Sequence, residues 1–465
     1  MINSREILTE ADAREIASAL SALLENKHFA DFRRESEALA PPDLAFVFEL
    51  TEPSLRPIFF RLLSKEKAAE SFVEIPSELQ LSLVQSFTDR ELSELLSELY
   101  IDDTVDLVEE MPAAVVKRIL RTSSKTDRDS INRILQYPKD SVGAIMTTEY
   151  MRLPRDITVS EALVRIRRVA LDKETIYTSY VTDGTRRLIG VVTAKKLLTS
   201  DPETLISDIM EESVISVKTT DDREYAAEKF SRYGFIALPV VDKEDRLVGI
   251  VTVDDAMTVL REEREEDFAK MAAVTPSETP YIKASPFSLF LSRIPWLLLL
   301  MVSATLSSTI LNRFEALLPT VLVLFVPMLM DTGGNSGGQA SVTVIRSISL
   351  GELGRGRILP IILKEALVGV LCGSALGAVA FVKVLLVDRL LMQNPEVTLY
   401  VALAVALSLA VTVLFAKIIG CVLPILAKGI GLDPAVMASP FITTLVDALA
   451  LVLYFGVSAS LVGLV

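Results

Sequence analysis

The stretch PMLMDTGGNSGGQ, residues 327–339, lies within an apolar run that extends from Leu317 to about Ile348. Four glycines at membrane depth serve one of two purposes: they let neighbouring helices approach closely, or they leave backbone carbonyls free to line a cavity. Asn335 and Gln339 lie four residues apart, on one helical face, and both side chains carry carbonyl oxygens that could bind a cation. A segment this polar costs free energy inside a membrane, so it predicts a functional part of the chain.

The C-terminal part of the chain consists of five long apolar runs, each of which reaches or exceeds the ~20 residues that cross a ~30 Å hydrocarbon layer. They are residues 294–311, 317–348 with a Gly-rich break after Met330, 359–387, 397–426 and 435–465. These runs predict an all-α transmembrane domain of five helices within residues 286–465. An odd number of spans places the two ends of the chain on opposite sides of the membrane.

Basic residues gather in the connections after the second and fourth runs, as expected for cytoplasmic loops. They are Arg346, Arg355, Arg357 and Lys364 in the first connection, and Lys417 and Lys428 in the second. The N-terminus has no apolar segment of the kind that opens a cleavable signal peptide. The sequence thus predicts a multi-pass protein of the cell (inner or plasma) membrane, with its N-terminus in the cytoplasm and its C-terminus outside.

Asp447 lies near the middle of the fifth run, with no other charge from residue 434 to 446 or from 448 to the end. An isolated carboxylate at this depth costs several kcal/mol unless it faces water or a cation. Thr443, one turn earlier, offers a hydroxyl and a carbonyl on the same face. The two interpretations that remain are a cation-binding carboxylate and a structural hydrogen bond to a neighbouring helix.

The net charge of −14 is unevenly distributed over the 465 residues. Residues 294–465 hold eight acids and nine bases, so residues 1–293 hold 53 acids and 38 bases. This acidity argues against nucleic-acid binding and favours the attraction of cations. The two cysteines, Cys372 and Cys421, give no disulfide framework or zinc signature. The single histidine, His28, cannot by itself support a His-ligated metal site.

Residues 138–260 contain two similar units, 138–202 and 203–260. Each opens on Ile-Met and closes on Gly-x-x-Thr, at Gly190–Thr193 and at Gly249–Thr252. The pair resembles tandem cystathionine-β-synthase-type (CBS) domains, which are α/β units. Such pairs often bind adenine nucleotides through a closing Asp. Asp255 fits this role, whereas the first unit has Lys196 at the corresponding position, so ATP remains only a weak expectation.

The two remaining cytoplasmic segments read as helical. Residues 1–137 show short helical patterns broken about every dozen residues, which predict a stacked helical N-domain; one begins with a capping box at Thr88–Glu91. Asp102 and Asp106 lie four apart, on one helical face. By itself this pair indicates only capping and a solvated edge. Residues 261–285 predict an acidic connecting helix that leads into the membrane.

From end to end, the chain resembles the MgtE family of magnesium transporters. The order of parts matches: a helical N-domain, a CBS pair, a connecting "plug" helix and five transmembrane helices. The most specific local matches are Gly334–Gln339, Asp433-Pro434-Ala435 and Thr444–Asp447. The resemblance implies a homodimer with a Mg²⁺ pore on its two-fold axis, and Asp447 matches the pore carboxylate. Mg²⁺ demands octahedral oxygen ligands and loses water reluctantly, so paired carboxylates could hold it through its waters.

The resemblance also implies Mg²⁺ sites between the cytosolic domains. The matching positions are Asp102, Asp106, Asp222, Glu224, Asp255, Glu263, Glu266 and Asp267. Bound Mg²⁺ would bridge mutually repelling carboxylates and lock the plug helix, which gives negative feedback on uptake. The chain departs from the expected acidic pattern at Gly234 and Thr258.

Three other functions are open to the sequence. A CBS-regulated transporter of another divalent cation such as Co²⁺ would normally use His or Cys ligands, and the pore segments contain no His. A negative pore residue argues against an anion carrier. An intramembrane aspartyl protease would need Gly-x-Gly-Asp, whereas here the glycines follow Asp331. The sequence therefore favours a Mg²⁺ channel or transporter over an enzyme, without deciding between channel and carrier.

Overall fold

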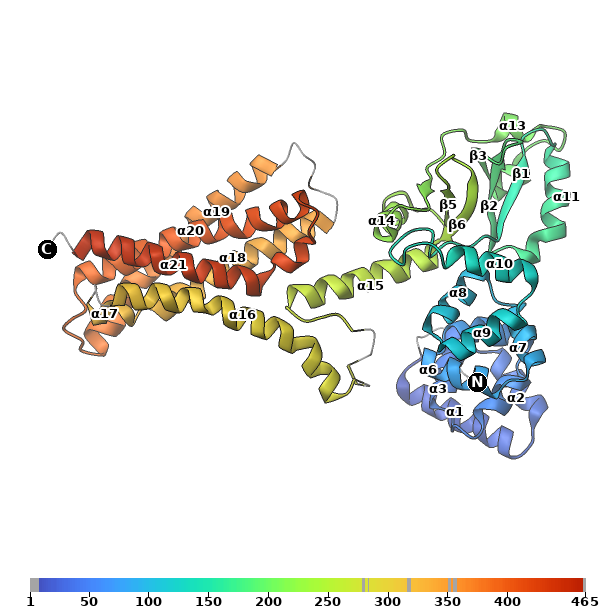
Figure 1. The fold of residues 1–465 in the computed structure, drawn as a ribbon, viewed down its shortest axis with the longest axis horizontal. Helices are drawn as coiled ribbons and strands as arrows, with labels where there is room; N and C mark the ends of the chain where they lie inside the picture. The colour runs from blue at the N-terminus through green and yellow to red at the C-terminus, as the bar shows by residue number, and fades with distance from the viewer. Residues whose placement is uncertain are drawn as a thin grey trace. The chain divides into compact units, whose positions relative to one another are not determined.

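The structure is a computed structural model, and it describes residues 8–277, 281–282, 284–315, 319–349, 353 and 358–462. The chain forms two compact units, Met1–Leu260 and Arg261–Val465. The first unit contains the helical N-terminal part and two α/β repeats, and the second contains the long apolar helices (Figure 1). Arg355 and Arg357, which carry part of the predicted loop charge, lie outside the described residues.

Short helices make up the N-terminal part of the first unit. Two of them begin with capping boxes, at Thr9 and at Thr88, so the predicted box at Thr88–Glu91 is confirmed. The helices are α1 Glu10–Glu25, α2 Phe29–Glu37, α3 Pro41–Leu50, α4 Arg56–Leu62, α5 Lys65–Val73, α6 Ser77–Ser86, α7 Asp89–Leu96, α8 Ile101–Glu110, α9 Ala113–Thr122 and α10 Lys125–Ile134. Most of them are too short to be stable alone, so the shared core decides whether they form.

That core is rich in phenylalanine. Phe59 is fully buried and meets Phe32 and Phe48 edge to face, with ring centroids 4.9 and 5.4 Å apart. Such pairs add about 0.5–1.5 kcal/mol beyond the burial of their area. The second half of the core continues through leucines of α6 and α7 to Ile119 of α9. The last helices, α8 and α10, instead bury Ile101, Val105 and Ile131 against the second α/β repeat.

The two α/β repeats have one topology. The first consists of β1 Tyr150–Pro154, α11 Val159–Val169, a 3₁₀ turn η1 Ala170–Asp172, β2 Thr175–Thr182, β3 Leu188–Thr193 and α12 Ala194–Thr199. The second consists of α13 Ile206–Ile209, β4 Val217–Lys218, α14 Arg223–Tyr233, β5 Ala237–Val241, β6 Leu247–Thr252 and α15 Val253–Met271. In each three-stranded sheet the first pair of strands is parallel and the second pair is antiparallel.

The repeats exchange their opening segments. Thr147, which follows the first Ile-Met, bridges to Ile250 of β6, and Glu211, which follows the second, bridges to Val191 of β3. The closing glycines allow this approach, because a Cβ on Gly190 or Gly249 would lie 2.7 Å from the sulfur of Met210 or Met146. Each repeat is therefore completed by the other, and the two fold as a pair.

Long helices make up the second unit. They are α16 Pro286–Glu315, α17 Thr320–Val323, α18 Val326–Ser349, α19 Ile358–Lys383 with a π-helical continuation η2 Val384–Leu391, α20 Leu399–Gly429, a 3₁₀ turn η3 Pro434–Met437 and α21 Ser439–Val462. Among the described residues, four helical stretches are long and apolar enough to cross a membrane: Pro286–Arg313, Ile358–Leu391, Leu399–Gly429 and Pro434–Leu461. The remaining predicted span, the second run at residues 317–348, corresponds to α18, which is long enough but too polar to meet the same criterion.

The glycine-rich stretch is part of a continuous helix, so the predicted break after Met330 is wrong. Its glycines permit close packing, the first of the two purposes considered for them. A Cβ on Gly334 would lie 2.8 Å from the Thr443 side chain in α21, and one on Gly337 would lie 2.8 Å from Ile442. Gly420 of α20 approaches most closely, because its Cβ would lie 2.2 Å from the carbonyl oxygen of Gly337. Helix α18 is thus clamped between α20 and α21 (Figure 1).

Gly420→Ala should destabilise this packing, because the added methyl group meets backbone rather than a movable side chain. Overpacking of this kind costs about 1–3 kcal/mol, so the midpoint of thermal unfolding in detergent should fall by several degrees. Gly456→Ala in α21 is the matched control, since nothing lies within 4 Å of its Cβ position. Equal midpoints for the two variants would contradict the close helix crossing.

Candidate functional site

A polar stripe follows the exposed side of α18. Asp331, Asn335, Gln339 and Thr343 recur every four residues and are exposed, whereas Gly333, Gly334, Ser336, Gly337, Gly338 and Ala340 between them are buried. Residues four apart lie on one face of a helix. Polar side chains facing lipid would be costly, so another surface or water must cover this stripe in a membrane.

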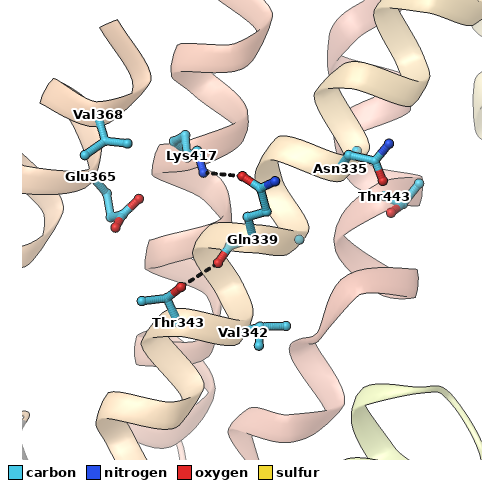
Figure 2. A pocket seen from close by; sticks show the side chains of 10 residues that line it. Asn335, Gln339, Val342, Thr343, Glu365, Val368, Lys417 and Thr443 are labelled. Atoms are coloured by element: carbon cyan, nitrogen blue, oxygen red, sulfur yellow. Dashed lines mark hydrogen bonds between the residues drawn. The ribbon is translucent and has the colours of Figure 1, made fainter. Parts of the chain in front are cut away.

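The middle of the stripe borders a cavity of about 920 Å³ (Figure 2). Its wall is built from four helices: Gly334, Asn335, Gly338, Gln339, Val342 and Thr343 of α18, Glu365 and Val368 of α19, Lys417 of α20 and Thr443 of α21. The cavity therefore brings together Asn335 and Thr443, two of the predicted site residues, and adds two charged groups, Glu365 and Lys417, that the sequence did not assign to a site.

Gln339 and Lys417 interact inside this wall. The Lys417 Nζ donates a hydrogen bond to the side-chain Oε1 of Gln339 at 3.1 Å, and the two side chains point toward each other in Figure 2. The carbonyl oxygen of Gln339, which the sequence suggested as a cation ligand beside that of Asn335, is thus already bonded. Lys417 is only 5% exposed and lies within α20. Its predicted place in a cytoplasmic loop is therefore wrong.

Asp447 lies on α21, one turn beyond Thr443, and is half-buried. Within the described residues its buried Oδ1 has no hydrogen-bond partner. This oxygen therefore lacks the structural hydrogen bond that was the alternative interpretation of the residue. A buried, unpaired carboxylate oxygen is costly unless water or a cation reaches it.

A second, smaller cavity of about 280 Å³ lies between the helical part and the α/β repeats of the first unit. Its acidic lining contains Glu70, Glu74, Glu98, Asp102, Asp103, Glu174, Asp254 and Asp255. Asp102 is 9% exposed, and within the described residues neither its Oδ1 nor Oε2 of Glu174 has a hydrogen-bond partner. Asp255 accepts a hydrogen bond from the Thr252 hydroxyl at 2.6 Å. Carboxylate oxygens are the ligands that Mg²⁺ and Ca²⁺ prefer.

Burial makes these carboxyls weaker acids than carboxyls exposed to water. It raises the pKa of Glu174 to about 8, with the charges of Asp103, Asp254 and Asp255 adding to the effect. Burial and the neighbouring Asp255 raise the pKa of Asp103 to about 7, and the pKa of Asp102 is also raised well above its usual value. Burial raises the pKa of Asp255 to about 6. The described residues nevertheless contain no group of three or more His, Cys, Asp or Glu arranged to hold a metal ion.

The structure brings together some of the predicted cytosolic residues and separates others. Asp102 and Asp255 share the acidic cavity. Asp106 is exposed and does not line it, and Asp222 instead caps α14, accepting a hydrogen bond from the Glu224 backbone at 2.8 Å. Sequence reasoning missed Asp103, Asp254 and Glu174. The first two adjoin predicted positions, whereas Glu174 lies before β2 and only the fold brings it here.

The departures at Gly234 and Thr258 have different structural settings. Gly234 ends α14 with a φ of +67°, a left-handed conformation that strongly favours glycine. The backbone therefore explains why no acid stands at this position. Thr258 lies on the exposed side of α15, and nothing in the structure explains the choice of threonine there.

The connecting helix contacts the membrane helices within the second unit. Among the acids of this part of α15, Glu263, Glu266 and Asp267 are half-buried, whereas Glu262 and Glu265 are exposed. Lys270 pairs with Glu266 and with Asp433, at 2.7 Å from the Asp433 Oδ2, and Ser349 donates to the Asp267 Oδ2 at 3.3 Å. Burial and the charge of Asp433 raise the pKa of Asp267. Asp433 and Lys270 were not among the predicted site residues.

Comparison with known proteins gives three family matches. Residues 39–140 match the MgtE intracellular N domain, residues 142–203 and 206–262 match CBS domains, and residues 326–457 match MgtE, described as a divalent cation transporter. The magnesium transporter MgtE of Thermus thermophilus is 35% identical over 448 residues, which cover 95% of this chain and 98% of the relative. That of Bacillus subtilis is 31% identical over 454 residues, covering 96% and 98%.

Two solved structures resemble the cytosolic part. The cytosolic domain of the Mg²⁺ channel MgtE in complex with ATP is 35% identical, with a TM-score of 0.50, and the match covers 52% of this chain and 99% of that chain. The soluble part of a magnesium transporter is 32% identical, with a TM-score of 0.51 and coverage of 54% and 99%. Both structures contain the cytosolic or soluble part of the related protein alone.

The stability of the soluble segment, residues 1–275, should fall as the pH rises. Because these pKa values are raised, the folded state binds more protons than the unfolded state between about pH 4 and pH 8. The free energy of unfolding is therefore highest below this range and decreases as the pH rises from about 4 to about 8. Thermal unfolding in chelator should show a falling midpoint, and Glu174→Gln should flatten the profile. The exposed Glu203→Gln is the control. A profile that Glu174→Gln leaves unchanged would contradict the buried-carboxyl assignment.

Proposed function

Because the chain belongs to the MgtE family of magnesium transporters, and is a transport protein rather than an enzyme, we propose that it conducts Mg²⁺ into the cell along α18 and α21 and that cytosolic Mg²⁺ closes this path. The observation that carries the proposal is the unpaired carboxylate oxygen of Asp447 within a membrane helix. Asn335 and Thr443 line the adjoining cavity and supply further oxygen atoms.

The pore forms between two copies of the chain. The exposed polar stripe of α18 crosses the membrane region from Asp331 to Thr343 and is covered when two stripes face one another around water. The two Asp447 carboxylates then meet across the axis. In this arrangement the N-terminus and the CBS domains are cytosolic, and five spans, α18 included, place the C-terminus outside.

The donor chemistry favours Mg²⁺ over softer divalent cations. Every polar group that we assign to the ion path is an oxygen donor, and the only histidine, His28, lies in the N-terminal part. Co²⁺ and Ni²⁺ prefer nitrogen or sulfur ligands, whereas Mg²⁺ keeps several waters and accepts a few carboxylate and carbonyl contacts. Asp447 therefore binds a hydrated ion through its waters, which allows the ion to leave again.

The acidic cavity of the first unit acts as the Mg²⁺ sensor. Its unpartnered buried oxygens, on Asp102 and Glu174, fit a cation that arrives with its own waters. Without a bound cation, ionisation of these clustered carboxyls makes them repel one another and favours separation of the N-domain from the repeats, where burial no longer raises their pKa values. Bound Mg²⁺ offsets this repulsion and stabilises the closed arrangement by mass action.

The half-buried acids Glu263, Glu266 and Asp267 connect this sensor to the pore. Asp433, which Lys270 contacts, caps the short turn before α21 by accepting a hydrogen bond from the Ala435 backbone at 2.8 Å. A change in the position of α15 is therefore passed to the helix that carries Asp447. ATP is a second ligand that we propose for the CBS pair, on the basis of the ATP complex of the related cytosolic domain.

Asp447→Ala should reduce Mg²⁺ uptake on the order of tenfold or more, because it removes the only carboxylate at this depth of α21. Asp447→Asn keeps the shape and should lose most of the uptake as well. Uptake is measured with a Mg²⁺-sensitive dye inside liposomes, and gel filtration shows whether each variant remains assembled. Glu396→Gln, an exposed acid outside the helices, is the control. Normal uptake by either Asp447 variant would refute the pore assignment.

The variant Glu263→Gln, Glu266→Gln, Asp267→Asn should conduct more than the wild type when the cytoplasmic face is bathed in millimolar Mg²⁺. Loss of the ligands that hold the closed arrangement outweighs loss of their repulsion under these conditions. At micromolar Mg²⁺ the variant should match the wild type or be slightly less open. Patch recordings in both solutions measure this, with the exposed Glu265→Gln on the same helix as control. Equal closure of both proteins at high Mg²⁺ would show that these acids have no role in gating and only form a solvated helix face.

A further inference from the structure

Lys417 is a charged residue that neither the pore nor the sensor uses. It lies in the apolar span of α20, is 5% exposed, and its ammonium donates to Gln339 at 3.1 Å. No ion pair of Lys417 occurs among the described residues. An intramembrane lysine with one neutral partner is expensive and normally marks a function.

Its position relative to Asp447 follows from helix packing. Gly334 of α18 packs against Thr443, and Asp447 lies one turn from Thr443 toward the C-terminal end of α21. Gln339 lies more than a turn from Gly334 in the other direction along the axis, because α18 and α21 run antiparallel across the membrane. With the C-terminus of α21 outside, Lys417 and Gln339 lie on the cytoplasmic side of the Asp447 carboxylate.

The hydrogen bond also decides which part of Gln339 is available. Its Oε1 accepts from the Lys417 ammonium, whose charge opposes a cation at the same oxygen, and its amide hydrogens are donors only (Figure 2). The ammonium and these hydrogens give this part of the wall a positive potential. Glu365, which lines the cavity from α19 without pairing with Lys417, is the opposing negative charge.

We propose that Lys417, with Gln339 held against it, is a fixed positive barrier that limits how fast a divalent cation leaves Asp447 for the cytoplasm. This inference rests on the proposed pore. The electrostatic energy scales with ionic charge, so the barrier is twice as high for Mg²⁺ as for Na⁺ at the same place. Lys417 is therefore a rate- and selectivity-determining residue, and Glu365 lowers the barrier that Lys417 raises.

Three substitutions separate the charge from the hydrogen bond. Lys417→Met removes both, Lys417→Gln keeps a donor for Gln339 but removes the charge, and Lys417→Arg keeps both. In liposomes with saturating external Mg²⁺, Lys417→Met and Lys417→Gln should each raise the maximal Mg²⁺ rate about threefold or more, and the Na⁺ rate by a smaller factor. Lys417→Arg should return both rates to near those of the wild type, and Glu365→Gln should lower the Mg²⁺ rate.

The same assay separates failure of this inference from failure of the pore. One outcome contradicts the barrier alone: Asp447→Ala conducts no Mg²⁺, while Lys417→Met and Lys417→Gln conduct Mg²⁺ no faster than the wild type. Gel filtration must show that both Lys417 variants are assembled. The proposed barrier is then wrong, and the proposed pore is retained. If only Lys417→Met conducts faster, the hydrogen bond rather than the charge sets the rate, and the inference is overturned. If Asp447→Ala conducts normally, the pore and the barrier both fail.

Discussion

The cost of charge in places with little water is the constraint on which this molecule depends. This cost applies to Asp447 and Lys417 inside membrane helices, and to Asp102 and Glu174 in the acidic cavity of the first unit. Well-packed apolar residues would be cheaper at each position. In the roles that we propose, Asp447, Asp102 and Glu174 bind a cation, and Lys417 supplies an electrostatic field. In the function that we propose, transport and its control are arranged around these groups.

Close helix packing makes this arrangement possible. Gly333, Gly334 and Gly337 bring α18 against α20 and α21, and the contact of Gly337 with Gly420 leaves no space for a methyl group. When one side of α18 is buried by glycines, its polar residues must occupy the other side. The polar stripe and the glycine-lined packing surface are thus two faces of one helix. A substitution that displaces the packing surface would therefore also displace the polar residues.

The contact at Asp433 shows how control could reach the pore without a long chain of residues. One aspartate pairs with Lys270 of the connecting helix and caps the turn that begins α21, the helix of Asp447. Asp267 and Ser349 make a parallel contact to the end of α18. The connecting helix therefore makes one polar contact to the end of α18 and another to the residue that caps the turn preceding α21.

The sequence by itself determined the order of parts, the apolar spans, the paired repeats and the isolation of Asp447, because hydropathy, periodicity and spacing are local properties of the chain. It could not decide between packing and a broken helix at Gly333–Gly338, since both use glycine, and it placed Lys417 in a loop because basic residues usually mark cytoplasmic ends. Only the tertiary structure brought Glu174 to Asp102, engaged the Gln339 carbonyl with Lys417 and set Asp433 against Lys270. These contacts join residues far apart in the chain, and burial, which changes their chemistry, is a property of the packed structure.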